Sequence, residues 1–361
     1  MRSPRLVIAG VIAIAALSAC ATTDDSGSAG TDARAVEVED GTPADTLRLG
    51  FFGNVTHSPA LIGVEKGFIA DALGGETALE TTVFNAGPAA VEALFAGAID
   101  ASYIGPNPAI NAFVKSNGDA VRIVSGATSG GAQLVVRDTI TSAADLKGAT
   151  LSTPQLGNTQ DVALRAWLAD EGLSTDTQGG GDVSIVPQEN AQTLDQFKAG
   201  AIDGAWLPEP WASRLVDAGA TVLVDEKDLW PDGEFVTTHI IVATQYLADH
   251  PQTVKALLEG HIEAVDYIND DPARAQPEVN AAIEKYAGKP LAAGIIARAF
   301  ENLTFTFDPI ASTLQQSADD AAAVGLTDPA DLAGIYDLRI LNALLRDNGD
   351  EPVSTAGLGE Q

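Results

Sequence analysis

The sequence is poor in cysteine and in basic residues. A single cysteine, Cys20, occurs in 361 residues, so no disulfide can form within the chain. Lysine and arginine together number 20 against 50 aspartate and glutamate residues, which gives a net charge of −30. Such a field repels nucleic acid and anionic lipid headgroups, so we expect neither as a partner.

The sequence also lacks the common catalytic motifs. It contains no Gly-x-Ser-x-Gly nucleophile elbow, no His-Glu-x-x-His helix and no Walker loop. Its four histidines, His57, His239, His250 and His261, are scattered and have no carboxylates at metal-ligand spacing. We therefore expect neither an enzyme nor a bound metal or cofactor.

A short apolar run identifies the N-terminus as a targeting segment. Residues 6–17 are apolar and follow Arg2 and Arg5. A run of about a dozen residues suits a secretory signal and is too short to cross a membrane, which takes roughly twenty. Its ending, Leu-Ser-Ala-Cys at residues 17–20, resembles a bacterial lipobox, which implies cleavage before Cys20 and lipidation of its thiol. The alternative is an ordinary secretory signal with an incidental cysteine.

Polar segments flank the part of the chain that is rich in apolar residues. Residues 21–46 contain no aromatic side chain and cannot bury enough apolar surface to order themselves. We expect residues 1–19 to be a signal peptide, 20–46 a lipidated tether and 347–361 a flexible tail. The folded body would then be anchored by lipid at the extracytoplasmic face of the cell membrane.

Apolar strands and amphipathic helices alternate from residue 47 onward. Residues 47–52 alternate like a strand, and the pattern through the middle of the chain predicts α/β architecture with mostly parallel sheets. Beyond residue 250 the pattern is nearly all helical. The helices expected there span residues 251–268, 277–286, 291–303, 309–324 and 330–345.

An internal repeat divides the chain into two similar halves. Ala-Gly-Ala-Ile-Asp occurs at residues 96–100 and again at 199–203. Each copy follows an amphipathic helix and leads through a short apolar strand into a Pro-x-Pro turn, at residues 106–108 and 208–210. The match extends over a strand, helix, strand, turn and helix, so we interpret it as two α/β lobes that face each other.

Strand-to-helix junctions supply the candidate binding groups. Helix-start signals occur at residues 57–59, 107–108, 157–160 and 209–210, two in each half. Free backbone N–H groups at such starts attract anions. The side chains that could add hydrogen bonds are Asn54, His57, Asn107, Gln155, Asn158, Thr159 and Gln160. The alternative is that each of them merely caps its own helix.

The order of these motifs resembles that of solute-binding proteins of ABC importers. The strand at 47–52, Gly-Pro-Asn-Pro at 105–108, Asp-Leu-Lys-Gly at 145–148 and the segment 202–211 together resemble the nitrate, taurine and aliphatic sulfonate branch. The resemblance implies a type II periplasmic-binding-protein fold whose two lobes are joined by two hinge strands. We place lobe 1 at residues 47–135 and 242–346 and lobe 2 at 136–241. The crossings are expected near 134–137 and 239–243.

The same resemblance implies which loops contact the solute. In lobe 1 they would be residues 54–57 and 105–108, and in lobe 2 residues 155–160 and 209–211, with Thr238 on the returning hinge. Glu209 could face an ammonium group or simply complement the dipole of its helix. His57 could donate to an anion or be a satisfied loop residue. Trp211 is the best candidate for an aromatic wall of the cleft.

These observations predict a monomeric lipoprotein that captures a small anionic or zwitterionic solute and delivers it to an ABC permease. An aliphatic sulfonate, including taurine, is the leading ligand. Nitrate, bicarbonate and a neutral pyrimidine precursor of thiamine are the alternatives, because the fold also resembles proteins of thiamine metabolism. An enzyme acting in the same cleft is the least favoured reading, since it would need neither lipobox nor tether.

Overall fold

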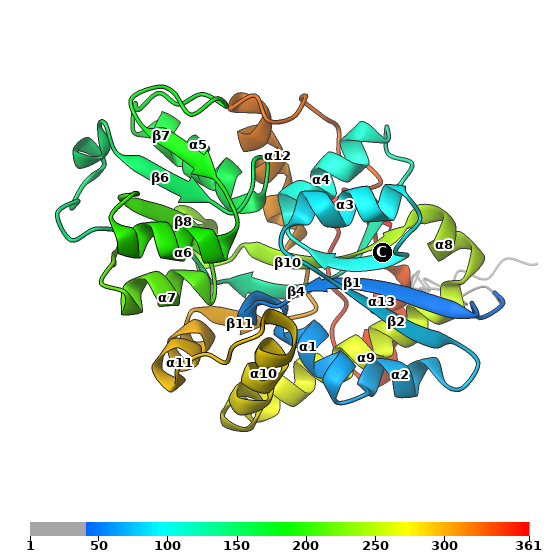
Figure 1. The fold of residues 1–361 in the computed structure, drawn as a ribbon. Helices are drawn as coiled ribbons and strands as arrows, with labels where there is room; N and C mark the ends of the chain where they lie inside the picture. The colour runs from blue at the N-terminus through cyan, green and yellow to red at the C-terminus, as the bar shows by residue number, and fades with distance from the viewer. Residues whose placement is uncertain (1–40, 361) are drawn as a thin grey trace, which may run out of the picture. The chain divides into compact units, whose positions relative to one another are not determined.

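The structure, a computed structural model, describes residues 41–360 (Figure 1). The expected signal peptide, Cys20 and the tether up to residue 40 lie outside the described residues. None of the helices between residues 41 and 360 has the length and apolarity that crossing a membrane requires.

Two β-sheets form the frame of the molecule. The larger sheet has eight strands in the order β13-β12-β4-β10-β3-β1-β2, with β11 paired to β4. Its strands are β1 (Thr46–Phe52), β2 (Ala78–Phe84), β3 (Ala101–Ile104), β4 (Val121–Gly130), β10 (Val236–Ala243), β11 (Leu303–Phe305), β12 (Tyr336–Asp337) and β13 (Gly359–Glu360). The smaller sheet has five strands in the order β7-β6-β8-β5-β9. They are β5 (Ala132–Val136), β6 (Thr150–Thr153), β7 (Ser184–Pro187), β8 (Gly204–Pro208) and β9 (Thr221–Asp225).

Strand directions differ in part from the expected mostly parallel sheets. Pairs joined through helices are parallel, as in β1 with β2 and β3, and in β6 with β7 and β8. Strand β10 is antiparallel to β3 and β4, and β5 is antiparallel to β8 and β9. Both sheets are therefore mixed, because the strands next to each crossing carry the chain back in the opposite direction.

Helices cover both sheets (Figure 1). Those around the larger sheet are α1 (Ser58–Glu65), α2 (Phe68–Leu73), α3 (Gly87–Phe95), α4 (Pro106–Lys115), α8 (Thr244–Asp249), α9 (Pro251–Asp270), α10 (Pro272–Ala287), α11 (Ala293–Glu301), α12 (Leu314–Ala323) and α13 (Arg339–Asn348). Those around the smaller sheet are α5 (Thr159–Asp170), α6 (Asn190–Ala199) and α7 (Trp211–Asp217). Short 3-10 turns are η1 (Val55–His57), η2 (Ala143–Leu146), η3 (Glu226–Leu229), η4 (Pro231–Gly233) and η5 (Ala311–Thr313). The helix expected over 330–345 begins only at Arg339, since β12 occupies residues before it.

Each sheet has its own apolar core. Leu47, Leu49 and Phe51 alternate along β1 and are fully buried in the core of the larger sheet. Leu134 and Trp206 lie in a separate cluster of the smaller sheet. Burial of each such side chain contributes about 1.5–3 kcal/mol, so both lobes have a core of their own.

The chain passes between the sheets at two places. The first crossing is the pair Gly130–Gly131, which separates β4 from β5 and has φ angles of 76° and 71°. The second is the segment 226–235 between β9 and β10. The crossings expected at 134–137 and 239–243 fall inside or directly after strands β5 and β10, because the apolar pattern runs through each strand without marking where it changes sheet.

The internal repeat has a common hydrogen-bonding role in the two lobes. Asp100 Oδ2 accepts from the backbone N–H of Arg48 at 2.8 Å, and Asp203 Oδ2 accepts from that of Thr150 at 2.8 Å. The backbone N–H of each aspartate donates to the carbonyl oxygen of the same partner, also at 2.8 Å. Each aspartate therefore fixes the start of one strand of its lobe, β1 or β6.

Both ends of the described chain are packed more closely than their composition predicts. Ala44 is buried, and its N–H donates to Thr253 Oγ1 at 2.9 Å. Near the other end, the side chain of Asn342 pairs with the backbone of Val353, at 2.8 and 3.0 Å, and β13 joins the larger sheet beside β12. The segment expected to be a flexible tail, 347–361, is thus held to the body between Val353 and Glu360 by hydrogen bonds, which composition does not reveal.

Candidate functional site

Four helices begin at the junctions where the sequence predicts helix starts. They are α1, α4, α5 and α7, with N-cap residues His57, Gly105, Asn158 and Pro210. None of these four caps makes a side-chain hydrogen bond to its own helix. Simple capping therefore does not explain why His57 and Asn158 stand at these positions.

A small cavity lies between residues of the two lobes. It is lined by Phe52, Asn54, Thr56, His57, Asn85, Gly105, Pro154, Asn158, Thr159, Gln160, Asn190, Pro208, Thr237 and Thr238. Among these residues there is no lysine, arginine, aspartate or glutamate. The cavity encloses about 20 Å³, which is room for about one water molecule. It is therefore a polar, uncharged space in which amides and hydroxyls predominate.

Two polar atoms in its wall are buried without a partner. They are Thr159 Oγ1 and Asn190 Oδ1, on side chains whose residues are 6% and 8% exposed. An unpaired buried polar atom costs about 1–3 kcal/mol, so a bound group that pairs with both would recover that cost. Gly105 permits this close approach, because a Cβ there would lie 2.5 Å from Thr159 Oγ1.

His57 is a neutral hydrogen-bond donor at this site. Burial lowers its pKa to about 3, so the ring is uncharged near neutral pH. Its Nδ1 accepts from the backbone N–H of Phe52 at 3.3 Å, which leaves the proton on Nε2. The ring packs against that of Phe52 with centroids 4.3 Å apart. His57 therefore contributes a fixed N–H dipole and no positive charge.

Hydrogen bonds between the lobes close this site. The N–H of Thr56 donates to the carbonyl oxygen of Glu209 at 3.4 Å, and Trp211 Nε1 donates to Asn54 Oδ1 at 2.9 Å. Thr238 Oγ1 donates to the carbonyl oxygen of Thr56 at 3.0 Å, so it lines the cavity while its proton is already used. The structure thus holds the two lobes against each other around the cavity.

Three of the expected ligand contacts line neither this cavity nor the one that adjoins it, and a fourth, Trp211, lines only the adjoining one. Glu209 is buried, and its carboxylate accepts from Arg298 at 3.1 Å, Asn302 at 2.6 Å and the N–H of Ser213 at 3.1 Å. Burial raises the pKa of Glu209, whereas these three partners favour its charged form. Its carboxylate therefore joins α7 to α11 and does not line the cavity.

The other two are Asn107 and Gln155. Asn107 Nδ2 donates to the carbonyl oxygen of Ser317 at 2.9 Å, which ties α4 to α12. The carbonyl oxygen of Gln155 accepts from the N–H of Asn158 at 3.1 Å and closes the turn before α5. Both residues act on the backbone that carries the site. Asn54, His57, Asn158, Thr159, Gln160 and Thr238 do line the cavity.

Trp211 borders a second, adjoining cavity of about 90 Å³. This space shares Asn54, Asn85 and Asn190 with the first and is also lined by Glu189. The side-chain amide of Asn85 donates to Glu189 Oε1 at 3.2 Å. One carboxylate therefore lies beside asparagines that the uncharged cavity also has in its wall.

Asn85 and Asn190 are the amide side chains of the cavity that the sequence analysis missed. Asn85 follows β2 directly, and Asn190 is the first residue of α6, soon after β7. An isolated asparagine after a strand is common and carries no signal of its own. The internal repeat supplies one, since β2 and β7 are equivalent strands, and each is followed by an asparagine that reaches the cavity.

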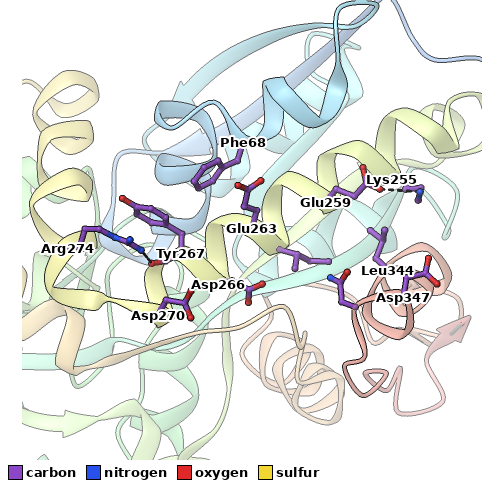
Figure 2. A pocket seen from close by; sticks show the side chains of 12 residues that line it. Phe68, Lys255, Glu259, Glu263, Asp266, Tyr267, Asp270, Arg274, Leu344 and Asp347 are labelled. Atoms are coloured by element: carbon purple, nitrogen blue, oxygen red, sulfur yellow. Dashed lines mark hydrogen bonds and ion pairs between the residues drawn. The ribbon is translucent and has the colours of Figure 1, made fainter.

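A larger hollow lies elsewhere, beside α9 and α13 (Figure 2). It encloses about 570 Å³ and contains no residue expected at the site. Lys255 pairs with Glu259 at 3.1 Å, and the Arg274 guanidinium lies 3.8 Å from the ring centroid of Tyr267 (Figure 2). Charged side chains of both signs thus line this hollow. Within residues 41–360 no cluster of three or more His, Cys, Asp or Glu is arranged to hold a metal ion.

Comparison with solved structures defines the class of protein. The alkanesulfonate-binding protein SsuA from Xanthomonas axonopodis pv. citri, bound to MOPS, is 21% identical with a TM-score of 0.65, covering 79% of this chain and 95% of that one. The periplasmic nitrate-binding protein NrtA from Synechocystis PCC 6803 is 19% identical with a TM-score of 0.68, covering 80% and 83%. The chain thus has the periplasmic-binding-protein fold, as expected.

Sequence comparison then gives the family. The profile of the NMT1-like family matches residues 40–283, so the chain belongs to the NMT1-like family. A binding protein of Brucella abortus (strain 2308) is 27% identical over 231 residues, 59% of this chain and 69% of that protein. The taurine-binding periplasmic protein of Escherichia coli (strain K12) is 27% identical over 209 residues, 57% and 63%. The resemblance stated from the sequence is confirmed.

Proposed function

We propose that this chain is the extracytoplasmic substrate-binding lipoprotein of an ABC importer and that it captures a small anionic solute, an aliphatic sulfonate in the first place. The observation that carries the proposal is the cavity between the lobes, where Thr159 Oγ1 is buried without a partner and its hydroxyl can donate to an oxyanion. A binding protein needs such unpaired groups, because the solute provides the missing partners. The two solved structures named above and the Escherichia coli relative are likewise binding proteins for sulfonate, nitrate or taurine.

Neutral donors can hold an anion here without a positive side chain. The starts of α1 and α5 lie at the cavity, and each helix start contributes about 0.3–1 kcal/mol to an anion, up to about 2 when partly buried. Micromolar binding needs about 8 kcal/mol. Hydrogen bonds to a charged group add about 1.5–3 kcal/mol each, so donation from His57, Asn158 and Thr159 would supply the difference.

The size of the cavity implies that the lobes must part to admit a solute. About 20 Å³ holds one water molecule, whereas a sulfonate has four heavy atoms before its alkyl group. We infer an open form that receives the solute and a closed form that surrounds it, with binding shifting the population toward closure. The adjoining cavity would take the alkyl group.

A zwitterion such as taurine would use Glu189 rather than Glu209. The oxygens of Glu209 are already bonded to Arg298, Asn302 and Ser213. Glu189 lines the adjoining cavity, where an ammonium group two carbons from a sulfonate would arrive. Taurine therefore remains within the proposed ligand class, with a different carboxylate as its partner.

The proposal includes a lipid anchor at Cys20 and an ABC permease as partner. Both rest on the lipobox-like ending of residues 17–20 and on the resemblance to importer components. The protein would act as a monomer at the extracytoplasmic face, and it would release its solute unchanged.

A ligand panel tests the proposal. We expect ethanesulfonate and taurine to raise the unfolding temperature of the purified protein and to give saturable heats in calorimetry, with nitrate and bicarbonate weaker. A shift with a neutral aminopyrimidine and none with sulfonates would replace the anion by a thiamine precursor. Conversion of any of these compounds during prolonged incubation would indicate an enzyme instead.

A further inference from the structure

A second large cavity lies beside the crossing segment 226–235 and shares no residue with the one between the lobes. It encloses about 550 Å³ and is bounded by the crossing segment, by α5 and by the η5–α12 region, which packs against α5. Its lining residues are Ala163, Ala166, Trp167, Asp170, Glu226, Leu229, Trp230, Pro231, Asp232, Glu234, Ile310, Ser312, Thr313, Gln316 and Asp320. This volume suits a small organic molecule.

Two indole rings, those of Trp167 and Trp230, form part of its wall and pack against other aromatic side chains. Trp230 is stacked on Phe235 with centroids 5.8 Å apart and an interplanar angle of 12°. Trp167 packs against Trp206 at 6.1 Å. Leu229 beside them is 47% exposed, although it is a large apolar side chain. The cavity therefore offers fixed aromatic and apolar surface to a ligand.

The charges of this cavity all have one sign. Five carboxylates line it, and no lysine, arginine or histidine does. Within residues 41–360 none of the five takes part in an ion pair. The hollow in Figure 2 differs, because Lys255 and Arg274 stand among its acids. The second cavity has negative charge with no internal counter-ion.

Two of these carboxylates lie in surroundings that favour a nearby positive charge. Glu226 is 2% exposed and accepts from Trp206 Nε1 at 2.7 Å. Burial in the first place, with the proximity of Asp225 and Asp320, raises the pKa of Glu226 to about 7, although hydrogen bonds from Trp206 and Trp230 oppose the shift. Burial also raises the pKa of Asp320, with Asp170 and Asp319 adding repulsion. A cation in the cavity would relieve this repulsion.

We propose that this cavity binds a small organic cation, an amine or quaternary ammonium ion with apolar substituents. Indole faces attract such cations more strongly than any other aromatic side chain, and carboxylates at the same site supply the opposite charge. An inorganic ion would leave the apolar wall unused, and a neutral molecule would leave the carboxylates unpaired. This site goes beyond the sulfonate cavity, and neither depends on the other.

Calorimetry on the purified chain tests this site with choline and benzyltrimethylammonium as probes. We expect saturable binding that weakens as salt is added, since screening reduces the attraction between exposed charges. The control ligand is 3,3-dimethylbutan-1-ol, in which carbon replaces the nitrogen of choline. Equal binding of this neutral analogue, or no saturable binding of either cation at millimolar concentration, would overturn the proposal.

Variants locate the binding. Asp320→Asn should weaken binding by about tenfold, because it removes a lining carboxylate and leaves the shape unchanged. Asp319→Asn is the matched control, because Asp319 accepts from Gln315 just as Asp320 accepts from Gln316, yet Asp319 does not line the cavity. We expect Asp319→Asn to bind as the parent does. An equal loss in both variants would contradict the site.

Asp170→Asn and Trp230→Phe provide a second test if Asp320→Asn destabilises the fold. Asp170 is exposed on α5, so its replacement leaves packing unchanged, and it should also weaken the cation severalfold. Trp230→Phe should weaken quaternary ammonium through the smaller ring. Unchanged affinity in both would exclude the cavity. Sulfonate affinity should remain at the parent value in all these variants.

Discussion

Individual side chains around the cavity differ in whether their polar atoms already have partners. The side chains of Thr238 and Asn107 donate to backbone carbonyl oxygens, whereas Thr159 Oγ1 and Asn190 Oδ1 have no hydrogen-bond partner. Residue type alone does not separate these groups, since threonine and asparagine occur in both. The distinction depends on neighbours that are far away in the sequence, such as Ser317 beside Asn107.

Asn158→Ala should weaken sulfonate binding about tenfold or more and leave stability nearly unchanged. Asn158 lines the cavity and makes no side-chain capping bond, so its amide should contribute more to the affinity for a solute than to the stability of α5. Calorimetry and thermal unfolding measure the two effects. Ser142→Ala is the control, because Ser142 forms a capping box at η2: it should lose about 1 kcal/mol of stability and no affinity. Unchanged sulfonate affinity in Asn158→Ala would remove this residue from the site.

Glu209→Gln should lower the free energy of unfolding by about 1–3 kcal/mol without changing the preference between sulfonate and taurine. The substitution weakens bonds to Arg298, Asn302 and Ser213, which are structural. Urea unfolding measures the stability, and Glu301→Gln, exposed on the same helix as Arg298, should change it by less than about 0.5 kcal/mol. A selective gain for plain sulfonate would return Glu209 to the ligand site.

Helices and strands carry the part of the site that the sequence predicts best. Proline and N-cap signals place the starts of α1, α4, α5 and α7 within two residues, because these signals act through local backbone geometry. The repeat also relates Asp100 to Asp203 correctly. The places where the chain crosses from one lobe to the other are less predictable, because the apolar pattern typical of a strand is the same before and after Gly130–Gly131.

Trp211→Phe should weaken sulfonate binding by about three- to tenfold. Trp211, the first residue of α7, donates to Asn54 in the turn before α1, so the bond joins elements of both lobes in the closed form. Loss of one such hydrogen bond costs about 0.5–1.5 kcal/mol. Trp167→Phe, away from the cleft, should leave affinity unchanged. Equal affinities for Trp211→Phe and the parent would show that this bond does not contribute to closure.

The molecule as a whole buries several ionisable groups, and burial shifts their pKa values away from the ordinary ones. Burial lowers the pKa of His57 to about 3 and those of His239 and His261 to about 4. The unfolded chain, with histidine near 6.5, therefore binds more protons below that pH than the folded chain does. Stability from these histidines is present above about pH 6.5 and is lost as the pH falls toward 4. Glu226, with its pKa raised to about 7, acts in the opposite direction between about 4.5 and 7.

His261→Gln should flatten this pH dependence. One buried histidine contributes a slope of about 1.4 kcal/mol per pH unit between about pH 4.5 and 6. His261 bonds to Tyr103 and to the carbonyl oxygen of Gly126, so the variant will also be less stable at every pH. Urea unfolding at several pH values gives the slope for each protein. Parallel curves for parent and variant would contradict the assignment.

The position of β10 also determines the order in which the lobes can be completed. Every strand of the smaller sheet lies between residues 132 and 225, whereas β10, at residues 236–243, separates β4 from β3 in the larger one. During synthesis from the N-terminus, the chain can therefore complete the smaller sheet of the inserted lobe while the larger sheet of the host lobe still lacks a middle strand. The lobe whose synthesis begins first can complete its sheet only after the inserted lobe has been synthesised.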